Sequence, residues 1–438
     1  SLSSDCRLQL RIAEKIGIPC VFGTKLTSED LHNTIVIDAI FGIGLSRHIT
    51  GEIAAIIRLV NNAAPFVVAV DIPTGIHSDT GEVMGEAIVA SQTVTFGIPK
   101  RGHYLYPGAH YSGKLTVADI GFPPAFLTDD RIAVNLVDAA SVRRLVPERP
   151  SHAYKNMFGH VLVVAGSTGK TGAALLTAKA CLRSGAGLVT LGVPESLLDV
   201  FMGAVTEEML LPLPDTGNGE LAPFAAPEIL RMVAERFDIV AIGPGLGRST
   251  TIGGIVTDLV LACPAPLVID ADGLYALSAQ TSLLQSAKAP IVLTPHAGEL
   301  KRLCSDKDQQ YVHRDRIETA RAFAAEHGVY LVAKGAPTIV ATPESRAFVN
   351  TSGNSGMATA GAGDVLTGII AALSGQRLTP YDAACAGCVA HGEAADRLAA
   401  RYGSRGMLAT DLFSTLRRVV NPDVIDLNHD EPSDSFSR

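Results

Sequence analysis

Runs of Val and Ile that end at Asp or Gly recur along the first 130 residues of the chain. In order they read TIVIDAIFGIG, FVVAVDIPTG, SQTVTFGIP and KLTVADIGFPP. Continuous apolar runs of this length are typical of parallel strands that are covered on both faces. Between the first two runs, GEIAAIIRLVNNAA places apolar residues at helical spacing and so predicts a βαβ unit. We therefore predict a first α/β domain over residues 1–130.

A second series of apolar runs begins at His160. The runs are HVLVVAG, LVTLGVP, FDIVAIGPGLG, PLVIDADGL, PIVLTPHAGE, VYLVAKGAPTIVATP and AFVN, separated by helical stretches such as GAALLTAKACLRSGAG. This alternation predicts one large doubly wound α/β domain over residues 151–425, in which ligands bind beyond the carboxyl ends of the strands. The mixed charge and prolines of residues 131–150 predict a linker. Residues 426–438 are polar and predict a disordered tail.

Composition and charge narrow the range of partners. The chain has 438 residues, of which 47% are hydrophobic, and this content is typical of large buried cores. Its formal net charge of -8, with no run of Lys or Arg, argues against nucleic acid as a partner. No apolar run approaches the ~20 residues of a membrane-spanning helix, and no secretory signal pattern opens the sequence. We expect small-molecule partners and a cytoplasmic location.

The cysteines form no obvious framework. Seven are scattered along the chain, which predicts reduced thiols in a protein of this size. Cys385, Cys388 and His391 are close enough in sequence to be metal ligands, but tetrahedral zinc needs a fourth ligand. The surrounding segment YDAACAGCVAHGEAADRLAA favours a buried helix of small residues instead.

The strongest chemical signal lies between Asn350 and Gly368, NTSGNSGMATAGAGDVLTG. Small residues let the main chain approach an anion closely, and the first turn of the helix predicted over VLTGIIAAL offers unpaired N–H donors to a phosphate. Asp364 stands at the start of that helix. It either caps the helix or deprotonates a hydroxyl that attacks phosphate. The absence of Lys, Arg and Glu from the stretch favours a wall that faces a ligand.

Glycine-rich turns also follow other predicted strands. GSTGKT at Gly166–Thr171 is not a P-loop, because Val164 stands where the pattern requires glycine, so it is either a tight turn or part of a pocket. GIGLSR at Gly42–Arg47 lacks the third glycine of a dinucleotide fingerprint. Asp38 and Asp71 end two neighbouring predicted strands and are expected to converge on that loop, either as ligand contacts or as caps.

Three more motifs lie at strand ends in the second half. GPGLG at Gly243–Gly247 permits either a close ligand approach or a simple tight turn. His296 in LTPHAGE could bond a ligand or a local partner, and Glu299 could cap the helix that follows. In KGAPT, Lys334 could meet a phosphate and Thr338 could hold the rest of a nucleotide, the alternative being a surface lysine in a hairpin.

Taken in order, GPGLG, VIDADGL, LTPHAGE, KGAPT and GAGDVLTG resemble the motifs of the ADP-dependent NAD(P)H-hydrate dehydratases of the ribokinase-like superfamily. The upstream DAIFGIGL, VDIPTG, TFGIPKRG and VADIGFP resemble the NAD(P)H-hydrate epimerase domain that many bacteria fuse to the dehydratase. The resemblance covers nearly the whole chain. It implies a C-terminal ribokinase-like doubly wound domain preceded by a Rossmann-like α/β domain of the epimerase type.

For the second domain, the resemblance implies an ADP-driven dehydration of 6-hydroxy-tetrahydro-NAD(P) to NAD(P)H, with AMP and phosphate as the other products. Hydroxide leaves poorly, so Asp364 is the candidate base that lets the hydroxyl become a phosphate ester first. Magnesium is expected as the counter-ion of the phosphates. The implied substrate contacts are Ala173, Gly245, Gly247, His296 and Asp364. The implied ADP or AMP contacts are Lys334, Gly335, Ala336, Pro337, Thr338, Asn354, Gly361, Ala362 and Gly363.

For the first domain, the resemblance implies interconversion of the R and S hydrates with Asp71 as catalytic acid/base. Asp38 and Thr74 match positions that bind potassium in the family. The implied substrate contacts are Asp71 and the loop residues Gly42, Ile43, Gly44, Leu45, Ser46, Arg47 and His48. The family's domain opens with a helical region, a strand and an Asn/Gly-rich loop, and residues 1–32 contain no such loop. We expect either that the domain lacks its N-terminal part or that the missing piece is supplied otherwise, so its epimerase activity stays open.

Two alternatives from other classes remain. A ribokinase-like kinase of a small alcohol, such as a vitamin precursor, would use the same aspartate after the same glycine loop. A binding module that senses nucleotides would need the loop without the base. The motifs HAGE and KGAPT favour the dehydratase over the kinase. The resemblance further suggests a symmetric homo-oligomer such as a tetramer.

Overall fold

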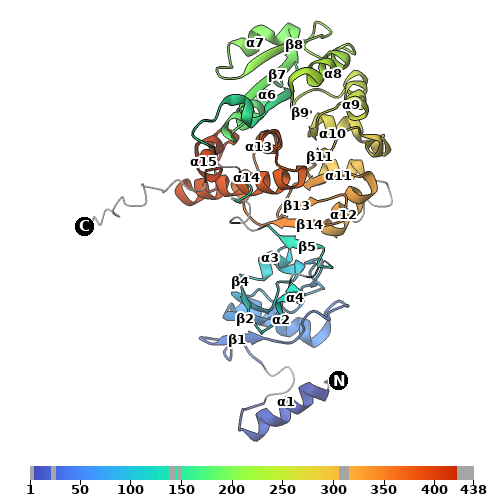
Figure 1. Cartoon of the computed structure of the whole chain (residues 1–438). Coiled ribbons are helices and arrows are strands. Elements are labelled where there is room, and N and C mark those ends of the chain that lie inside the picture. Colours follow the sequence, from blue (N-terminus) through green and yellow to red (C-terminus); the bar gives the residue numbers. More distant parts are fainter. Residues whose placement is uncertain are drawn as a thin grey trace, which may run out of the picture. The chain divides into compact units, whose positions relative to one another are not determined.

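The computed structural model describes residues 4–20, 26–127, 129, 131–137, 140, 144–146, 149–304 and 315–421. The chain divides into two compact units, Ser1–Asp129 and Asp130–Arg438 (Figure 1). Each unit is described by itself.

The first unit is built on a parallel sheet. Its strands run in the order β1 (Ile35–Asp38), β2 (Phe66–Val70), β3 (Gln92–Phe96) and β4 (Lys114–Ala118). The unit also contains α1 (Ser4–Lys15), α2 (Gly51–Ala63), η1 (Arg101–His103), α3 (Gly108–Tyr111) and α4 (Pro124–Leu127). The βαβ unit predicted from the apolar spacing is formed by β1, α2 and β2.

Only one face of this sheet is well covered. Helix α2 buries Ala54, Ile57 and Val60 in a cluster with Val67 of β2. The paired residues Ile35 and Phe66 point to the opposite face and are mostly exposed. The expectation that these strands are covered on both faces is therefore wrong for the described part of this unit, since α2 packs on one side only.

The second unit contains a mixed ten-stranded sheet in the order β5-β14-β13-β12-β11-β10-β9-β6-β7-β8. Strand β13 runs antiparallel to both of its neighbours, and the other pairs are parallel. The strands are β5 (Val134–Leu136), β6 (His160–Val164), β7 (Leu188–Pro194), β8 (Met209–Leu213), β9 (Ile239–Ile242), β10 (Leu267–Ile269), β11 (Ile291–Leu293), β12 (Tyr330–Ala333), β13 (Thr338–Ala341) and β14 (Ala347–Asn350).

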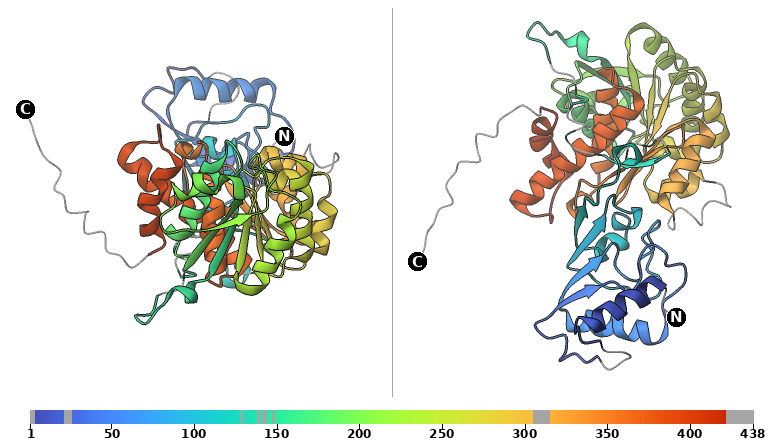
Figure 2. Two further views of the ribbon diagram at one scale, coloured as in Figure 1. Left: turned by 90° about the horizontal axis from the view of Figure 1, so that it is seen from above. Right: turned by 60° about the horizontal axis from the view of Figure 1, so that its bottom comes forward.

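Helices cover both faces of the large sheet (Figure 2). Helices α6 and α13 to α15 pack together on one face, and α8 to α12 line the other. This is the doubly wound arrangement predicted from the sequence. The helices are α6 (Thr171–Arg183), α7 (Leu198–Met202), α8 (Ala225–Arg236), α9 (Thr250–Ala262), α10 (Asp272–Leu277), α11 (Ala297–Leu303), α12 (Arg316–His327), α13 (Ala362–Gly375), α14 (Pro380–Tyr402) and α15 (Leu412–Val419). Short 3-10 turns occur at η2 (Lys155–Phe158), η3 (Glu195–Leu197), η4 (Thr281–Ser286), η5 (Ser355–Met357) and η6 (Ala409–Asp411).

Helix α13 is the central helix of this unit and is buried along most of its length. Its small residues permit close packing: a Cβ at Gly368 would collide with the Thr177 carbonyl of α6, and one at Gly387 of α14 would lie 2.7 Å from Ile370. Ile370 and Ala371 pack against Val161 and Ala241 of the sheet. Because the helix is fixed on several sides, its first turn, which carries Asp364, has a defined position.

Two strands of the sheet are not evident from the sequence. Strand β5 lies within the segment predicted as a linker and pairs in parallel with β14 at one edge. Strand β8, MLLPL, pairs with β7 at the other edge. Both are edge strands: β5 has only three residues, and β8 contains a proline, which argues against a strand in a sequence pattern. The predicted tail, residues 426–438, lies outside the described residues.

The predicted small-residue helix is α14. Cys385, Cys388 and His391 are all buried along it. In the described ranges, no group of three or more His, Cys, Asp or Glu side chains is arranged to hold a metal ion. None of the helices that the structure describes is long and apolar enough to cross a membrane.

Candidate active site

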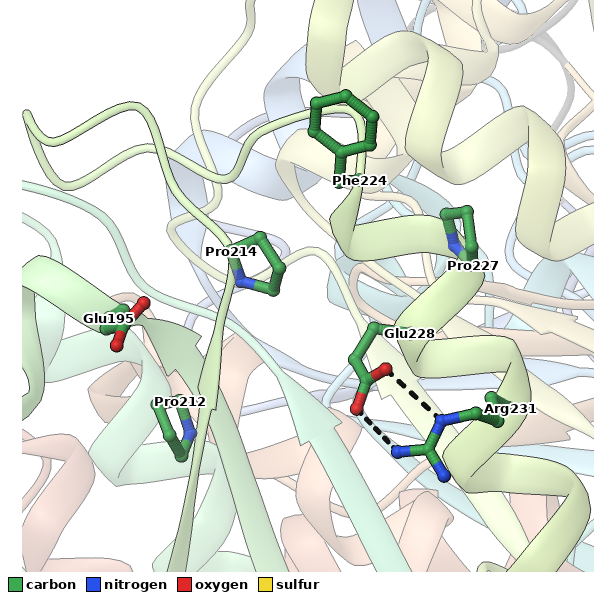
Figure 3. Close-up of a pocket in the computed structure, with 7 residues that line it drawn as sticks. All are labelled: Glu195, Pro212, Pro214, Phe224, Pro227, Glu228 and Arg231. Atoms are coloured by element: carbon green, nitrogen blue, oxygen red, sulfur yellow. Dashed lines mark hydrogen bonds and ion pairs between the residues drawn. The ribbon is translucent and has the colours of Figure 1, made fainter.

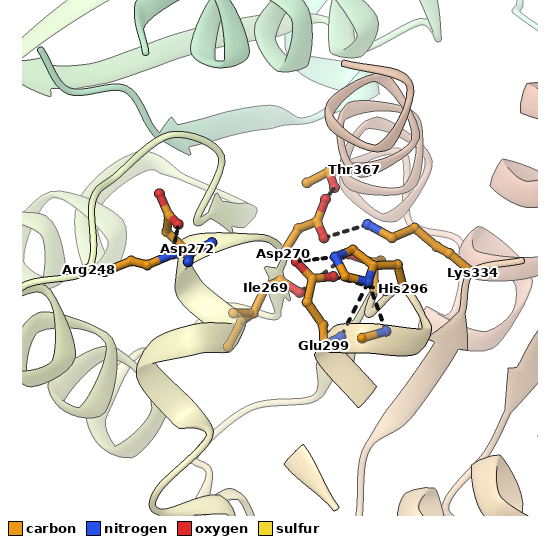
Figure 4. A network of polar contacts seen from close by, with 10 residues as sticks. Arg248, Ile269, Asp270, Asp272, His296, Glu299, Lys334 and Thr367 are labelled. Atoms are coloured by element: carbon orange, nitrogen blue, oxygen red, sulfur yellow. Dashed lines mark hydrogen bonds and ion pairs between the residues drawn. The ribbon is translucent and has the colours of Figure 1, made fainter. Parts of the chain in front are cut away.

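In the second unit, polar side chains gather where β10, β11 and β12 end beside the start of α13 (Figure 4). These strands are parallel, so their carboxyl ends meet at one edge of the sheet. Asp270 directly follows β10 and Lys334 directly follows β12. The sequence motifs that are far apart along the chain are thereby brought into one cluster.

Lys334 and Asp270 form the centre of this cluster. The Lys334 Nζ donates to Asp270 Oδ1 at 2.8 Å, and Thr367 Oγ1 donates to Asp270 Oδ2 at 2.7 Å. Asp270 is only 1% exposed, so the lysine provides its counter-charge inside the protein. Burial alone would lower the pKa of Lys334, but attraction by Asp270 outweighs it and the pKa is raised.

Gly363 lets the helix start approach these charges. A Cβ at this position would lie 3.1 Å from Lys334 Nζ and 3.7 Å from Asp270 Oδ2. Gly361, which precedes the helix, has a φ of 87°, a conformation that side chains rarely adopt. A side chain is therefore sterically unfavourable at both positions, and the glycines leave the first N–H groups of α13 open to a ligand.

Asp364 lies in the first turn of α13. Its main-chain carbonyl accepts a hydrogen bond from Thr177 Oγ1 at 3.1 Å, whereas its carboxylate accepts none from the described residues. It is therefore not a helix cap. Burial, and then the negative charge of Asp270, raise the pKa of Asp364 to about 7 against the opposing effect of Lys334. A half-buried carboxylate with a pKa near neutrality is suited to accept a proton from a substrate.

Asp272 forms a second polar cluster next to the first. Its carboxylate accepts hydrogen bonds from Lys170 Nζ at 2.8 Å, Arg248 Nε at 2.8 Å and the Gly247 N–H at 3.0 Å. Burial tends to raise the pKa of Asp272, but these donors outweigh it and the pKa is lowered. The Gly247 turn is thus tied to the helix that follows β10.

The turns around Gly247 bring the predicted substrate contacts together. Ser167 Oγ donates to the Gly245 carbonyl at 2.7 Å. A Cβ at Gly245, whose φ is 66°, would lie 3.3 Å from the Ala173 side chain of α6. Ala173, Gly245 and Gly247 therefore lie in one region beside α6, as residues that contact the same substrate must.

His296 bonds local partners. Its Nδ1 accepts from the Gly298 N–H at 3.0 Å and the Glu299 N–H at 3.3 Å, so it caps α11. Glu299 completes the cap by accepting from the His296 N–H at 2.9 Å. Since Nδ1 is an acceptor, the neutral ring carries its proton on Nε2. The side chain is 57% exposed, which leaves the ring accessible to a ligand.

The predicted nucleotide segment joins β12 to β13. Thr338 Oγ1 donates to the Gly335 carbonyl at 3.1 Å, and the Arg316 guanidinium donates to the Ala336 carbonyl at 3.1 Å. The peptide bond between Ala336 and Pro337 is cis. Gly335 and Ala336 are exposed, so their main chain can reach a ligand.

Asn354 is engaged within the protein. Its Oδ1 accepts from the Gly356 N–H at 3.0 Å, and its Nδ2 donates to Asp396 Oδ1 at 2.9 Å. The Gly353 N–H donates to the other oxygen of Asp396 at 2.8 Å. The amide of Asn354 therefore shapes the loop before α13. A nucleotide contact from this residue would have to use atoms that these hydrogen bonds leave free.

The first unit has its own polar site at the ends of β1 and β2. Asp38 accepts from Thr74 Oγ1 at 2.6 Å and from the Thr74 N–H at 2.7 Å. Thr74 Oγ1 also lies 3.3 Å from the Phe41 carbonyl. Burial raises the pKa of Asp38 even though Thr74 opposes the effect. The Thr74 hydroxyl thus lies between the Phe41 carbonyl and a buried carboxylate that has no cationic partner in the described chain.

Asp71 follows β2 with a φ of 68°, which is unusual for a residue with a side chain. Its carboxylate accepts a short hydrogen bond from Lys100 Nζ and one from Thr95 Oγ1 at 3.0 Å. Burial opposes the effect of these donors, yet the pKa of Asp71 is lowered. His103 contacts the Asp71 carbonyl through Nε2 at 2.9 Å, and burial lowers the pKa of this histidine to about 4.

The predicted substrate loop of the first unit lies beside β1. Most of its residues, Gly42, Ile43, Gly44, Ser46, Arg47 and His48, are exposed. Leu45 is buried in the cluster that contains Ile49 and Ile57. Its side chain therefore anchors the loop, and only its main chain is available to a ligand.

Sequence reasoning missed several residues at these sites. Asp270 and Asp272 stand in the VIDADGL motif, whose two acids after a strand were a usable signal. Lys170 and Arg248 pair with Asp272 from distant turns, and Lys100 pairs with Asp71. No local pattern identifies these cations, because their partners are distant in sequence.

A surface cavity of about 430 Å³ lies elsewhere on the second unit (Figure 3). It contains none of the predicted site residues. Prolines and the ion pair between Glu228 and Arg231 form much of its wall, together with Glu195, Pro212, Pro214, Phe224 and Pro227.

The fold and the position of Asp364 place the second unit among the ribokinase-like proteins. Comparison with family models gives two matches. Residues 161–418 match the model described as NAD(P)H-hydrate dehydratase, and residues 1–102 match the model described as YjeF-related protein N-terminus. Together these models cover both units.

Curated relatives match most of the chain. A bifunctional NAD(P)H-hydrate repair enzyme Nnr from Moorella thermoacetica is 41% identical over 425 residues, covering 96% of this chain and 80% of the relative. The enzyme of the same name from Escherichia coli is 39% identical over 404 residues, covering 92% of this chain and 74% of the relative. The chain belongs to the family of bifunctional NAD(P)H-hydrate repair enzymes.

A solved structure supports the fold of the second unit. The ADP/ATP-dependent NAD(P)H-hydrate dehydratase from Bacillus subtilis, co-crystallised with ATP/Mg2+, aligns with a TM-score of 0.57 and 27% identity. The alignment covers 66% of this chain and 98% of that structure. The resemblance inferred from the motifs and the expected fold class are therefore confirmed.

Proposed function

We propose that the second unit catalyses the dehydration of (6S)-NAD(P)H hydrate to NAD(P)H, with ADP as co-substrate and AMP and phosphate as products. The observation that carries this proposal is the Asp364 carboxylate, which has no hydrogen-bond donor in the described chain and a pKa of about 7. It stands at the open N-terminus of α13, where a phosphate would be held.

The proposed reaction has two steps. Asp364 takes the proton of the C6 hydroxyl while that oxygen attacks the β-phosphorus of ADP, and AMP leaves. Phosphate then leaves C6 with its electron pair as a proton is lost from the neighbouring carbon, which restores the ring of NAD(P)H. The N–H groups at the start of α13 and just before it, at Gly361 to Gly363, would bind the transferred phosphate oxygens. Lys334 would stabilise the charge that develops there.

The ligands are assigned to two sides of this point. Ala173, Gly245, Gly247 and His296 would contact the hydrate, the last through its Nε2–H. Lys334 to Thr338 would contact the adenine nucleotide, together with the loop that Asn354 shapes. We do not assign a dedicated magnesium site, because Asp270 and Asp272 are already occupied by cations. Magnesium would be bound mainly by water and by the nucleotide phosphates, and it would neutralise the negative charge of the phosphates.

For the first unit, we propose epimerisation of the R and S hydrates with Asp71 as acid/base and Lys100 next to it. A potassium ion would bind at Asp38 and Thr74. The supporting observation is the buried Asp38 carboxylate beside the oxygens of Thr74 and Phe41, since buried carboxylates usually have a cationic partner. The exposed loop from Gly42 to His48 would contact the substrate.

We further propose a cytoplasmic homo-oligomer such as a tetramer. None of the seven cysteines, all of which lie in the described ranges, forms a disulfide, in agreement with a reducing compartment. Val200, Met202 and Met209 are exposed apolar residues of α7 and β8 that could be covered by a second copy. Light scattering of the purified protein measures the number of subunits.

The dehydratase proposal is tested by incubating the protein with ADP and NADH hydrate and following absorbance of the reduced nicotinamide. We expect absorbance to return only when ADP is present. A kinase of a small alcohol, the other candidate, is less well supported, since HAGE and KGAPT belong to the dehydratase pattern. Consumption of nucleotide with a small alcohol, and no recovery of NADH from the hydrate, would favour the kinase.

A further inference from the structure

Arg316, the first residue of α12, lies against the segment proposed to bind the nucleotide. Its Nη1 donates to the Ala336 carbonyl at 3.1 Å. Its Nη2 lies so close to Gly335 that a Cβ there would collide with it. The guanidinium is thus held beside Gly335 and Ala336, two exposed residues of this segment, although Arg316 itself belongs to α12.

The charge of Arg316 is not neutralised within the described chain. The two acids nearest to it in α12 are used elsewhere: Asp315 caps the helix by accepting from the Glu318 N–H at 3.0 Å, and Glu318 pairs with Arg321 at 2.7 Å. Among the residues that the structure describes, the Ala336 carbonyl is the one hydrogen-bond acceptor found for Arg316. The residue is half-buried, and this burial lowers its pKa although the group stays charged.

The second cation beside this segment, unlike Arg316, has an acidic partner. Lys334, one residue before Gly335, already donates to Asp270 at 2.8 Å. Of the two cations that border the segment, Arg316 is therefore the one with charge and donors left for a ligand. A half-buried guanidinium without an acid partner favours an anion, and its planar fork of donors matches two oxygens of a phosphate.

We propose that Arg316 binds a phosphate of the adenine nucleotide. This inference rests on the nucleotide role proposed for Lys334 to Thr338. Arg316 would act from the start of α12 and Lys334 from the end of β12, so that the nucleotide phosphates are held by both residues. A second role in holding the Ala336 carbonyl is compatible with this contact, because the guanidinium has five donors.

The test compares ligands with and without phosphate. Titration calorimetry with the full chain would measure the Kd of ADP, and competition would measure that of adenosine, for wild type, Arg316→Gln and Arg316→Lys. Loss of a charge-assisted hydrogen bond should raise the Kd of ADP about tenfold to hundredfold. The Kd of adenosine should stay the same, and lysine should restore part of the affinity for ADP. If the Kd values of ADP and adenosine rise together, or neither rises, the inference is wrong.

Arg321→Gln is the matched control. It removes an arginine of the same helix whose charge is paired with Glu318, so it should leave ADP affinity within twofold of wild type. Thermal melting of each variant shows whether it is folded. An ADP affinity that falls equally in Arg321→Gln would mean that α12 acts only as a support, against the inference.

This test is separable from that of the proposed function. A wild-type protein that binds ADP but does not convert the hydrate would contradict the dehydratase proposal and leave the binding comparison intact. A variant Arg316→Gln that converts the hydrate with an unchanged KM for ADP would overturn the inference alone. Wild-type protein without any affinity for ADP would contradict both.

Discussion

The Lys334 ammonium lies 2.8 Å from Asp270, and the Asp364 carboxylate beside them has no hydrogen-bond donor among the described residues. The charge of the lysine is therefore already shared with Asp270 before a ligand binds. Asp270 also adds negative charge next to Asp364 and helps to raise its pKa. This arrangement separates two tasks: one aspartate fixes the cation, and the other stays available to take a proton.

Replacing Asp364 by Asn should abolish turnover and leave nucleotide binding intact. The amide fills the same volume but cannot accept the proton of the hydroxyl, so kcat should fall about 10²- to 10⁴-fold. Calorimetry with ADP provides the control for folding. A variant that keeps its full rate would show that Asp364 has no chemical role.

The rate should depend on the ionisation of Asp364. A base with a pKa of about 7 is mostly protonated at pH 6, so kcat/KM for the hydrate should rise with pH through about 7 and level off above it. A pH series with ADP at saturation measures this limb. A rate that is flat between pH 5.5 and 8.5 contradicts the assignment.

The same shift has a consequence for stability. The pKa of Asp364 is raised in the folded state, so ionisation of its carboxyl group destabilises the folded protein. The free energy of unfolding therefore falls as the pH rises from 4 to 7. Asp364→Asn escapes this cost. In denaturant titrations without ligand, the variant should gain roughly 2–4 kcal/mol relative to wild type on going from pH 4 to pH 8. A constant difference over this range would mean that the pKa is not raised.

Removal of the counter-charge of Lys334 should destabilise the second unit. Asp270→Asn leaves a mostly buried ammonium without its acid, which typically costs about 3–5 kcal/mol. Urea titration measures the loss. Asp258→Asn, on the exposed face of α9, is the matched control and should change stability by less than ~0.5 kcal/mol. Equal effects of the two substitutions would argue that the ion pair is unimportant.

In the first unit, Lys100→Met should slow epimerisation at least about tenfold, since it removes the cation that stabilises ionised Asp71. Dehydration of the S hydrate should not change. Conversion of the R hydrate, coupled to an excess of dehydratase, measures the effect. Lys114→Met removes an exposed lysine of β4 and should leave epimerisation at the wild-type rate.

Much of this architecture could be predicted from local patterns. The apolar runs ending at Ile242 and Ile269 are strands, because buried parallel strands are almost wholly apolar, and the run ending at Asp38 is a strand although Ile35 and Ile37 are mostly exposed. Strands β5 and β8 escaped prediction for different reasons. Strand β5 has only three residues and forms by pairing with β14, and the proline in β8 interrupts an otherwise apolar run.

The site was predictable where a motif carries its own chemistry. The glycines before Asp364 and the position of His296 before a helix signal their geometry locally. The pairings of Lys334 with Asp270 and of Arg248 with Asp272 join residues that are far apart in sequence, so only the folded sheet reveals them. The hydrogen bond between Asn354 and Asp396 could not be predicted from the sequence for the same reason.

The central claim is that the C6 hydroxyl oxygen attacks the phosphorus of ADP and leaves as part of phosphate. It is tested most directly with a hydrate that carries ¹⁸O in this hydroxyl, by mass spectrometry of the phosphate released during turnover. The proposed mechanism predicts one ¹⁸O atom in each phosphate that forms with NADH. Unlabelled phosphate, with the ¹⁸O recovered in water, would contradict it.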